Sequence, residues 1–473
     1  MRCSGPFSFN RDLHNEPLPM PDSLIFTLLS FLVALAVLIT VHEFGHFWVA
    51  RRLGVRVLRF SIGFGQPLWR RTARDGTEYV IAAIPLGGYV KMLDEREAPV
   101  PEADLPYAFN RKSLWRRSAI VMAGPLFNFL FAILAYWGIY VTGDVGARPL
   151  VGAVDAGSPA EEVGFRPGDE ILEVNGHRTP TWESVLFGLM AAQGEGSDVP
   201  VRVREADGHE SVHYLDAKTL GRLGDDPDVM KQLGLEPARP ELPPVIGKVM
   251  LGEPADEAGL RSGDRLLAAD GTPLKTWKAW VDYVRARPGR PIQVKLERGG
   301  KILRVRIVPR ALPTKEGTVG HIGAGVQVPE GLFERYRVEV RYGPWEALGQ
   351  SLRKTWDLSA TMLRVMGRML TGQASLENLS GPISIAQTAG RAAHVGVGYF
   401  VKFLAVVSIS LGVLNLFPIP VLDGGHLLFF LIEAVRGAPL SERAMEQGQR
   451  LGIALLVGLM FLAFYVDLNR LLG

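Results

Sequence analysis

Four long apolar runs constrain the fold of this chain more than any other feature of its sequence. They cover Leu24–Val41, Ile120–Val141, Phe403–Phe417 with a continuation through Leu427–Ile432, and Leu451–Val466. A helix needs roughly 20 predominantly apolar residues to cross the hydrocarbon core of a bilayer. Buried helices of a soluble protein are the alternative, but they rarely remain free of charge over such lengths. The runs therefore predict a polytopic α-helical membrane protein with four transmembrane helices.

Basic residues gather in the short segments that would lie on one side of the membrane. The segment between the first two runs and the loop between the last two contain arginine and lysine at positions 51, 52, 56, 59, 70, 71, 74, 111, 112, 116, 117, 436 and 443. Short basic loops remain in the cytoplasm. We therefore expect both termini and the large 143–395 region to lie across the membrane, although these arginines would also suit a merely solvated surface.

Net charge and cysteine content exclude some classes of protein. The formal net charge is only +3, which does not indicate a nucleic acid as partner, and the single cysteine, Cys3, excludes a disulfide framework. The first 20 residues include Arg11, His14 and Glu16 and have no apolar core, so they do not form a signal peptide. We expect a flexible tail over 1–21, or a chain whose true start is Met20.

The middle of the chain contains a duplication. Residues 151–176 and 246–271 align at a constant offset of 95 with 12 identical positions out of 26. Each copy has an apolar strand, a proline-containing turn before a short helix, and an alternating strand that ends at Asn-Gly or Asp-Gly. Both copies resemble PDZ domains, which are α+β and bind extended peptides or protein termini along a strand edge. The expected edges are 150–152 and 245–247, and spacers or size filters without a ligand are an equal alternative.

Two further segments have clear periodicity. From Pro344 to Leu370 the apolar residues recur at helical spacing with basic residues between them, which predicts an amphipathic helix. This helix could lie on the membrane surface or pack against the second copy of the repeat. The segment Glu78 to Met92 alternates apolar residues around Pro85 and Gly87–Gly88, which predicts a strand or hairpin near the membrane.

The first apolar run continues directly into His42-Glu43-Phe44-Gly45-His46. On a helix, His42 and His46 lie one turn apart on the same face, where two imidazoles can bind one zinc ion. Glu43 can then act as the general base for a water molecule that the ion activates. A polar cluster that merely ends the helix is the alternative, but polar residues in an apolar span are expensive unless they have a function.

A third protein ligand is expected because catalytic zinc usually has three, with the fourth position left open. The third apolar run supplies Asp423, which follows the helix breakers Pro418 and Pro420 and precedes Gly424–Gly425. A carboxylate in these surroundings needs a cation, and zinc bound by the two histidines provides one. A helix cap is the alternative for Asp423. His426 is a competing candidate for this ligand, but we favour a role in packing or in contacting a ligand side chain.

These motifs closely resemble those of the site-2 protease family of intramembrane zinc metalloproteases. The resemblance rests on His42–His46, on the pattern Asn-x-x-Pro-x-Pro-x-Leu-Asp-Gly-Gly over 415–425, and on the two repeats between the second and third spans. Segments 60–65, 84–95 and 379–385 add to it, and it extends from about residue 22 to the C-terminus.

The resemblance implies a bacterial inner-membrane enzyme with one Zn²⁺ per chain, an active site toward the cytoplasm and periplasmic PDZ domains. It implies substrates that are single-pass membrane proteins already shortened by another protease, an anti-sigma factor first and remnant signal peptides second. It also implies that Asn415 holds the substrate strand, for which hydrogen bonding between helices is the alternative. Asn128 in the second run is assigned to such helix–helix bonding.

The domain organisation expected from these features has six parts. They are the tail over 1–21, a first catalytic membrane part over 22–145, PDZ domains over 146–238 and 239–315, a linker with the amphipathic helix over 316–395, and a second membrane part over 396–473. A scaffold that only binds partners through its PDZ domains is the competing function. It predicts that loss of His42 or Asp423 leaves function intact, whereas no catalytic residue of the motifs is degraded.

Overall fold

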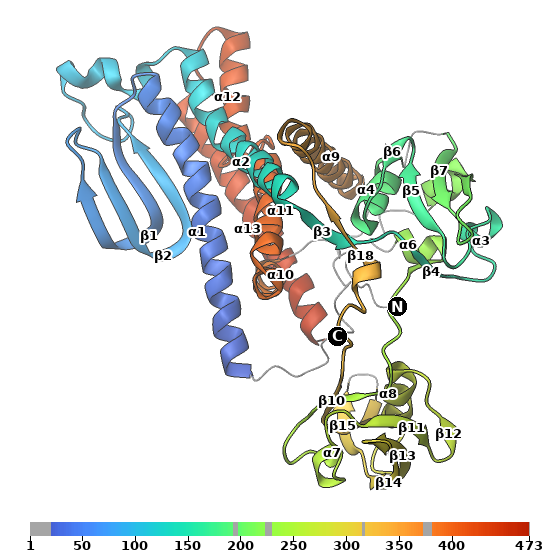
Figure 1. Cartoon of the computed structure of the whole chain (residues 1–473). Helices are drawn as coiled ribbons and strands as arrows, with labels where there is room; N and C mark the ends of the chain where they lie inside the picture. The colour runs from blue at the N-terminus through green and yellow to red at the C-terminus, as the bar shows by residue number, and fades with distance from the viewer. Residues whose placement is uncertain (1–19, 193–196, 223–228, 315–316, 372–380, 473) are drawn as a thin grey trace. The chain divides into compact units, whose positions relative to one another are not determined.

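The computed structural model describes residues 20–192, 197–222, 229–314, 317–371 and 381–472 (Figure 1). The chain divides into two compact units. The first, the membrane unit, comprises Pro17–Asp144 and Glu339–Leu472, and the second, the repeat unit, contains Val145–Val338. Most of the expected N-terminal tail lies outside the described residues.

Within the described part of the membrane unit, four helices are long and apolar enough to cross a bilayer, as the sequence predicts. They are α1 (Met20–Arg52), α2 (Leu114–Thr142), α11 (Val397–Asn415) and α13 (Glu442–Leu472). Large apolar side chains on them face outward, with Leu24 60% and Phe461 73% exposed. A soluble core would bury such side chains, whereas lipid-facing helices expose them.

The third apolar run is broken as its prolines predict. α11 ends at Asn415, and α12 (Asp423–Arg436) begins only after a non-helical segment that contains Pro418 and Pro420. A Cβ atom at Gly424 or Gly425 would collide with the carbonyl oxygens of Phe417 or Ile419. Glycine is therefore required for the turn to fold back closely, and Asp423 becomes the first residue of a new helix.

A two-stranded sheet packs against α1. Strands β1 (Val57–Thr72) and β2 (Glu78–Met92) pair antiparallel, which confirms the strand expected over 78–92. Residues 59–62 of β1 pair with 78–81 on one side and 88–91 on the other. A Cβ atom at Gly88 would lie 3.0 Å from Glu43 Cγ and 2.7 Å from Ile39 Cγ2. The close approach of β2 to α1 at Glu43 therefore depends on glycine at position 88.

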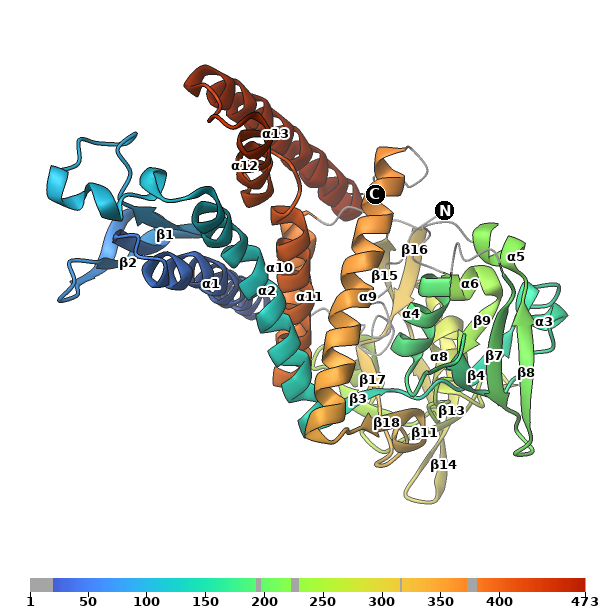
Figure 2. The same ribbon diagram turned by 90° about the horizontal axis from the view of Figure 1, so that it is seen from above.

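The amphipathic helix is present as α9 (Pro344–Leu370), and it packs against α2 and α11 within the membrane unit (Figure 2). Its contacting face contains the buried residues Ala347, Ser351, Thr355 and Leu358. Trp345 and Trp356 are exposed, at 86% and 72%. The sequence offered the membrane surface or the second copy of the repeat as its place, whereas the described residues show contact with the spans α2 and α11.

Asp467 directly follows the fourth apolar run, Leu451–Val466, which the sequence predicts as a span. In the structure it lies within α13 and is only 1% exposed. Its carboxylate accepts hydrogen bonds from the main-chain N–H groups of Gly381 (3.1 Å), Ile383 (2.9 Å) and Ser384 (3.1 Å). These groups open α10 (Pro382–Val395), whose first turn has no cap of its own. A carboxylate at a helix N-terminus is stabilised by the unpaired N–H groups there.

The repeat unit contains the same sheet twice. In the first copy, β5 (Glu170–Val174), β6 (His177–Arg178), β7 (Val199–Arg204) and β8 (Glu210–Leu215) form a sheet of order β6-β5-β7-β8. In the second, β11 (Arg265–Ala269), β12 (Thr272–Pro273), β13 (Ile292–Arg298) and β14 (Lys301–Ile307) have the order β12-β11-β13-β14. Each copy has its own buried core and one long helix, α4 (Trp182–Ala192) or α8 (Trp277–Arg285).

The remaining elements of the repeat unit are short. They are β3 (Asp144–Ala147), β4 (Val151–Val154), α3 (Pro159–Glu162), α5 (Ala217–Arg222), α6 (Val229–Leu233), β9 (Leu235–Pro237), β10 (Ile246–Val249), α7 (Pro254–Glu257), β15 (Arg310–Thr314), β16 (Gly317–His321), β17 (Ala324–Val326) and β18 (Arg337–Val340).

The peptide-binding edges expected at 150–152 and 245–247 are not free. Strand β4 pairs with β9, and Val151 N–H also donates to Asp169 C=O at 2.7 Å. In the second copy β10 pairs with β17, and Ile246 N–H donates to Asp264 C=O at 2.8 Å. The sequence pattern identified each strand but not its neighbour, which is β9 in the first copy and β17 in the second. Strand β17 lies beyond residue 315, within the segment that the sequence assigned to a linker. Peptide addition would have to use another edge, such as that of β9 or β17.

Candidate metal centre

The candidate metal centre begins on one face of α1. The helix continues without a break through His42 and His46, so the two side chains point the same way one turn apart. Their Nε2 atoms lie 3.2 Å from one another. His46 is buried and His42 is nearly so. The spacing of the motif thus places two nitrogen ligands side by side.

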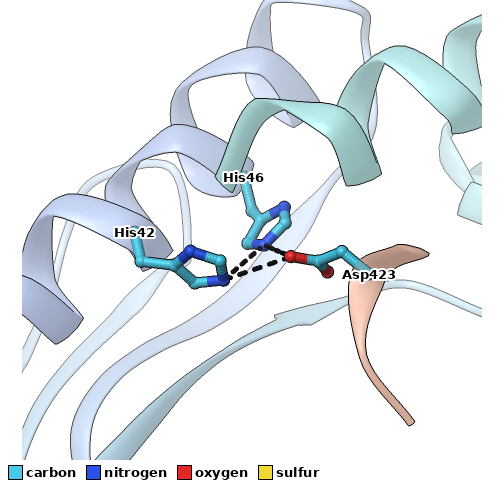
Figure 3. Close-up of side chains that lie close together, drawn as sticks. All are labelled: His42, His46 and Asp423. Atoms are coloured by element: carbon cyan, nitrogen blue, oxygen red, sulfur yellow. Dashed lines mark hydrogen bonds and ion pairs between the residues drawn. The ribbon is translucent and has the colours of Figure 1, made fainter. Parts of the chain in front are cut away.

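Asp423 approaches these nitrogens from α12, a helix almost 380 residues further along the chain. Its Oδ2 atom lies 3.3 Å from His42 Nε2 and 3.4 Å from His46 Nε2 (Figure 3). This oxygen is buried and accepts no hydrogen bond from any described residue. A buried carboxylate oxygen without a donor requires a compensating cation.

The three ligand atoms have the spacing that a zinc ion requires. Zinc binds histidine nitrogen and carboxylate oxygen at about 2.0–2.2 Å in tetrahedral geometry, which separates ligand atoms by about 3.3 Å. The three measured separations are 3.2, 3.3 and 3.4 Å. Among the described residues these side chains form the group able to hold a metal ion. Two imidazoles and one carboxylate are also a donor set that zinc accepts.

The ring of His46 is held by a hydrogen bond on its far side. His46 Nδ1 lies 2.8 Å from the main-chain oxygen of Ile120 in α2. A carbonyl oxygen can only accept, so the proton of the neutral ring sits on Nδ1 and the lone pair of Nε2 faces Asp423. Metal-binding histidines typically have such an acceptor behind the ring.

Gly124 leaves the space that both imidazoles occupy. A Cβ atom there would collide with His46 Nε2 and lie 2.7 Å from His42 Cε1. Gly45 allows the same approach from the other helix, since its Cβ atom would collide with the carbonyl oxygen of Ala123. Close contact between α1 and α2 beside the two imidazoles therefore depends on glycine in both helices.

We expect Gly124→Ala to weaken zinc binding because the new methyl group overlaps the ligand positions. Overpacking typically costs about 1–3 kcal/mol, which corresponds to a roughly 5–150-fold loss of affinity if it falls on the bound state. Gly138→Ala is the matched control, because a Cβ atom at that position of α2 meets nothing within 4 Å. Zinc affinity of the purified variants checks this, and an unaltered affinity for Gly124→Ala would show that the imidazoles do not need this space.

The other expected site residues lie on adjoining elements. Glu43 is half-buried on α1, between the two histidines in sequence and against Gly88 of β2. Asn415 is the half-buried last residue of α11. His426 is on the first turn of α12, where its ring makes an edge contact with Phe429. His426 is outside the group of three metal-binding side chains.

One residue pair that the sequence did not indicate anchors the helix of Asp423. Arg117 of α2 donates two hydrogen bonds to the Glu433 carboxylate, at 3.2 and 2.5 Å. Both side chains are largely shielded, with 12% and 18% exposed. A shielded, bidentate pair of this kind restricts both helices. Because Glu433 and Asp423 share α12, the pair also restricts where Asp423 can lie.

Comparison with known proteins places this chain among peptidases. Residues 30–459 match the family model described as peptidase family M50. The chain is 47% identical over 450 residues to the regulator of sigma-E protease RseP of Escherichia coli K12, covering 95% of this chain and 100% of that protein. It is 45% identical to protease RseP of Yersinia pestis, with the same coverage.

A third relative is described by its metal. A putative zinc metalloprotease of Vibrio cholerae is 42% identical, with 95% of this chain and 99% of the relative covered. Among solved structures, the chain is similar to a PDZ domain of an SdrC-like protein from Listeria monocytogenes. The match covers 19% of this chain and 88% of that structure, with 25% sequence identity and a TM-score of 0.16.

Proposed function

The chain belongs to peptidase family M50, and from this premise we propose that it is a zinc endopeptidase that cuts single-pass membrane proteins within or at the edge of the bilayer. The observation that carries the proposal is the meeting of His42, His46 and Asp423 between helices of the membrane unit. A relative described as a putative zinc metalloprotease, aligned over 95% of this chain, supports the chemistry.

Each proposed site residue has a distinct role. His42, His46 and Asp423 would hold one Zn²⁺, which supplies Lewis-acid activation of water when bound. Glu43 would take the proton from the attacking water and deliver it to the leaving amine, because it stands beside the first ligand on the same helix. Asn415 would donate a hydrogen bond to the substrate main chain from the end of α11.

An extended substrate fits the surroundings of Glu43. A peptide bond inside a helix is shielded by its own turn, whereas a strand exposes its carbonyl group to attack. The segment 88–91 of β2 has β1 on one side, and Gly88 brings it against Glu43. An unwound substrate segment could pair with this outer edge by strand addition.

The location and partners follow from charge and from the relatives. Basic loops flanking the spans favour an inner-membrane protein with the active site toward the cytoplasm and the repeat unit in the periplasm. Relatives described as regulators of sigma-E favour an anti-sigma factor, shortened by an earlier cut, as substrate. The two copies of the repeat would act as PDZ domains that bind peptides or limit the size of substrates.

A reporter fused after Gly473 tests the orientation and should be periplasmic.

Metal removal tests the proposed reaction. We expect the purified, lipid-reconstituted chain to cut a shortened single-pass substrate, to lose this activity in a zinc chelator, and to regain it when zinc is returned. The zinc supplies the activation on which the reaction depends. Full-length substrate, tested beside the shortened one, shows whether a prior cut is required. Cleavage that continues in protein shown to be free of metal would contradict the proposal.

A further inference from the structure

We infer that Asn128 is a positioning residue of the metal centre, whose side-chain oxygen holds the His42 ring with Nε2 toward the ion. The inference rests on the proposed zinc function, and it replaces the assignment of Asn128 to helix–helix bonding. Asn128 lies on α2, is fully buried, and its side-chain amide is 3.1 Å from His42 Nδ1.

The direction of the His42 ring decides which amide atom must face it. His42 Nε2 is the atom near Asp423 and His46, so Nε2 is the ligand and its lone pair must be free. A neutral imidazole then carries its proton on Nδ1 and donates from there. An amide N–H₂ group cannot accept this hydrogen bond, whereas the amide oxygen can. Ligation through Nε2 therefore requires the oxygen of Asn128 at the position 3.1 Å from Nδ1.

The atoms of Asn128 allow this orientation. Nitrogen and oxygen of an amide have nearly the same shape, so hydrogen-bond partners decide which of them occupies each position. With the N–H₂ group toward His42, the oxygen is buried and has no partner among the described residues. Rotating the amide by half a turn places that oxygen on the Nδ1 proton. The buried acceptor then has a donor and the ligand ring has an acceptor.

The second ligand ring shows the same arrangement. His46 Nδ1 contacts the main-chain oxygen of Ile120, which is two turns before Asn128 on α2. Both imidazoles thus have an acceptor supplied by the same helix, one from its main chain and one from a side chain. Outer acceptors of this kind orient metal-binding histidines and raise their basicity.

Helix–helix bonding does not account for the side chain. Ser408 of α11 donates its hydroxyl to Asn128 at 2.9 Å, but the acceptor is the main-chain oxygen of Asn128. Any residue at position 128 would provide that acceptor. The side chain faces α1 instead, where it contacts His42. The two contacts can therefore be separated by substitution, with Ser408→Ala removing one and a change at 128 removing the other.

The inference is tested by the zinc affinity of the full-length purified chain. This affinity is measured by competition with a chromophoric chelator. Loss of a residue that hydrogen-bonds a metal ligand typically weakens metal binding roughly 10–100-fold. We expect a loss of this size for Asn128→Leu and for Asn128→Ala. Leucine keeps the branched arrangement of side-chain atoms of asparagine, and alanine introduces no clash, so the two variants together separate loss of the hydrogen bond from a change in packing. Asn128→Asp keeps an oxygen acceptor and should bind zinc nearly as well as wild type. Ser408→Ala should leave the affinity unchanged.

Three results would overturn a conclusion, two of them the role of Asn128 and one the proposed function. If a folded Asn128→Leu or Asn128→Ala variant binds zinc with wild-type affinity, the role of Asn128 is wrong while the zinc centre stands. The same holds if Ser408→Ala weakens zinc binding as strongly as the changes at 128, because general loosening of the helices would then be the cause. If wild type itself binds no stoichiometric zinc, the proposed function fails first.

Discussion

Glu43→Gln is expected to abolish most cleavage while leaving zinc bound. Glutamine has the shape of glutamate but cannot take a proton, and loss of a general base typically lowers the rate roughly 10²–10⁴-fold. Glu43 is not among the three metal-binding side chains, so the zinc content should remain that of wild type. Single-turnover cleavage of a shortened membrane substrate, with metal analysis on the same sample, measures both quantities.

The matched control is Glu346→Gln, because Glu346 is an exposed glutamate in the first turn of α9 within the same membrane unit. It should cut at the wild-type rate. Unchanged cutting by Glu43→Gln would show that Glu43 is not the general base. Loss of zinc from Glu43→Gln would instead show that Glu43 supports the ion rather than the proton transfer.

Asp423→Ala is expected to remove both zinc and cleavage. The substitution deletes the oxygen that completes the three-ligand set, together with the negative charge that compensates the ion. The loss of zinc affinity should therefore exceed the roughly 10–100-fold that follows loss of a residue hydrogen-bonded to a metal ligand. Asp423→Ala and wild type are compared by zinc content per chain after dialysis against a weak chelator, and by cleavage of the same samples.

Folding of this variant is expected to survive. The Arg117–Glu433 pair still anchors α12 to α2, and Gly424 and Gly425 still permit the turn before it. A normal elution profile and helix content would establish this. Glu433→Gln, which keeps all three ligands but weakens the anchor, should retain more zinc than Asp423→Ala. Equal zinc content in Asp423→Ala and wild type would contradict a role for Asp423 in metal binding.

The parts of the site that the sequence could predict depend on local geometry. Histidines at positions 42 and 46 share one face of any uninterrupted helix, and the apolar run before them made that helix the expected structure. The break before Asp423 followed in the same way from Pro418 and Pro420. In both places short-range sterics decide the backbone, so the residues indicate the structure directly.

Contacts between distant segments could not be predicted from the same patterns. Gly124 looks like an ordinary residue of an apolar span and Asn128 like a helix–helix contact, and only the packing of α2 on α1 shows that they adjoin the two imidazoles. The Arg117–Glu433 pair joins residues 316 positions apart. Buried polar residues within spans were the available signal, since they are costly in lipid unless they have partners. That signal identifies Asn128 as significant but does not name its partner.

The repeat shows a related limit. Twelve identities in the aligned segments correctly indicated two copies of one fold, but not which strand of each copy lies at an edge. Strands β9 and β17 come from the ends of the copies, beyond the aligned region, and they cover β4 and β10. Strand neighbours depend on the return path of the chain, which has no local signature.

Anomalous diffraction at the zinc absorption edge, from crystals of the wild-type chain in lipid, tests the central claim most directly. The account predicts one peak per chain, within bonding distance of His42 Nε2, His46 Nε2 and an oxygen of Asp423, and its disappearance in crystals of Asp423→Ala. A zinc-replete crystal with the peak at other side chains, or with the peak unaltered in Asp423→Ala, would contradict it.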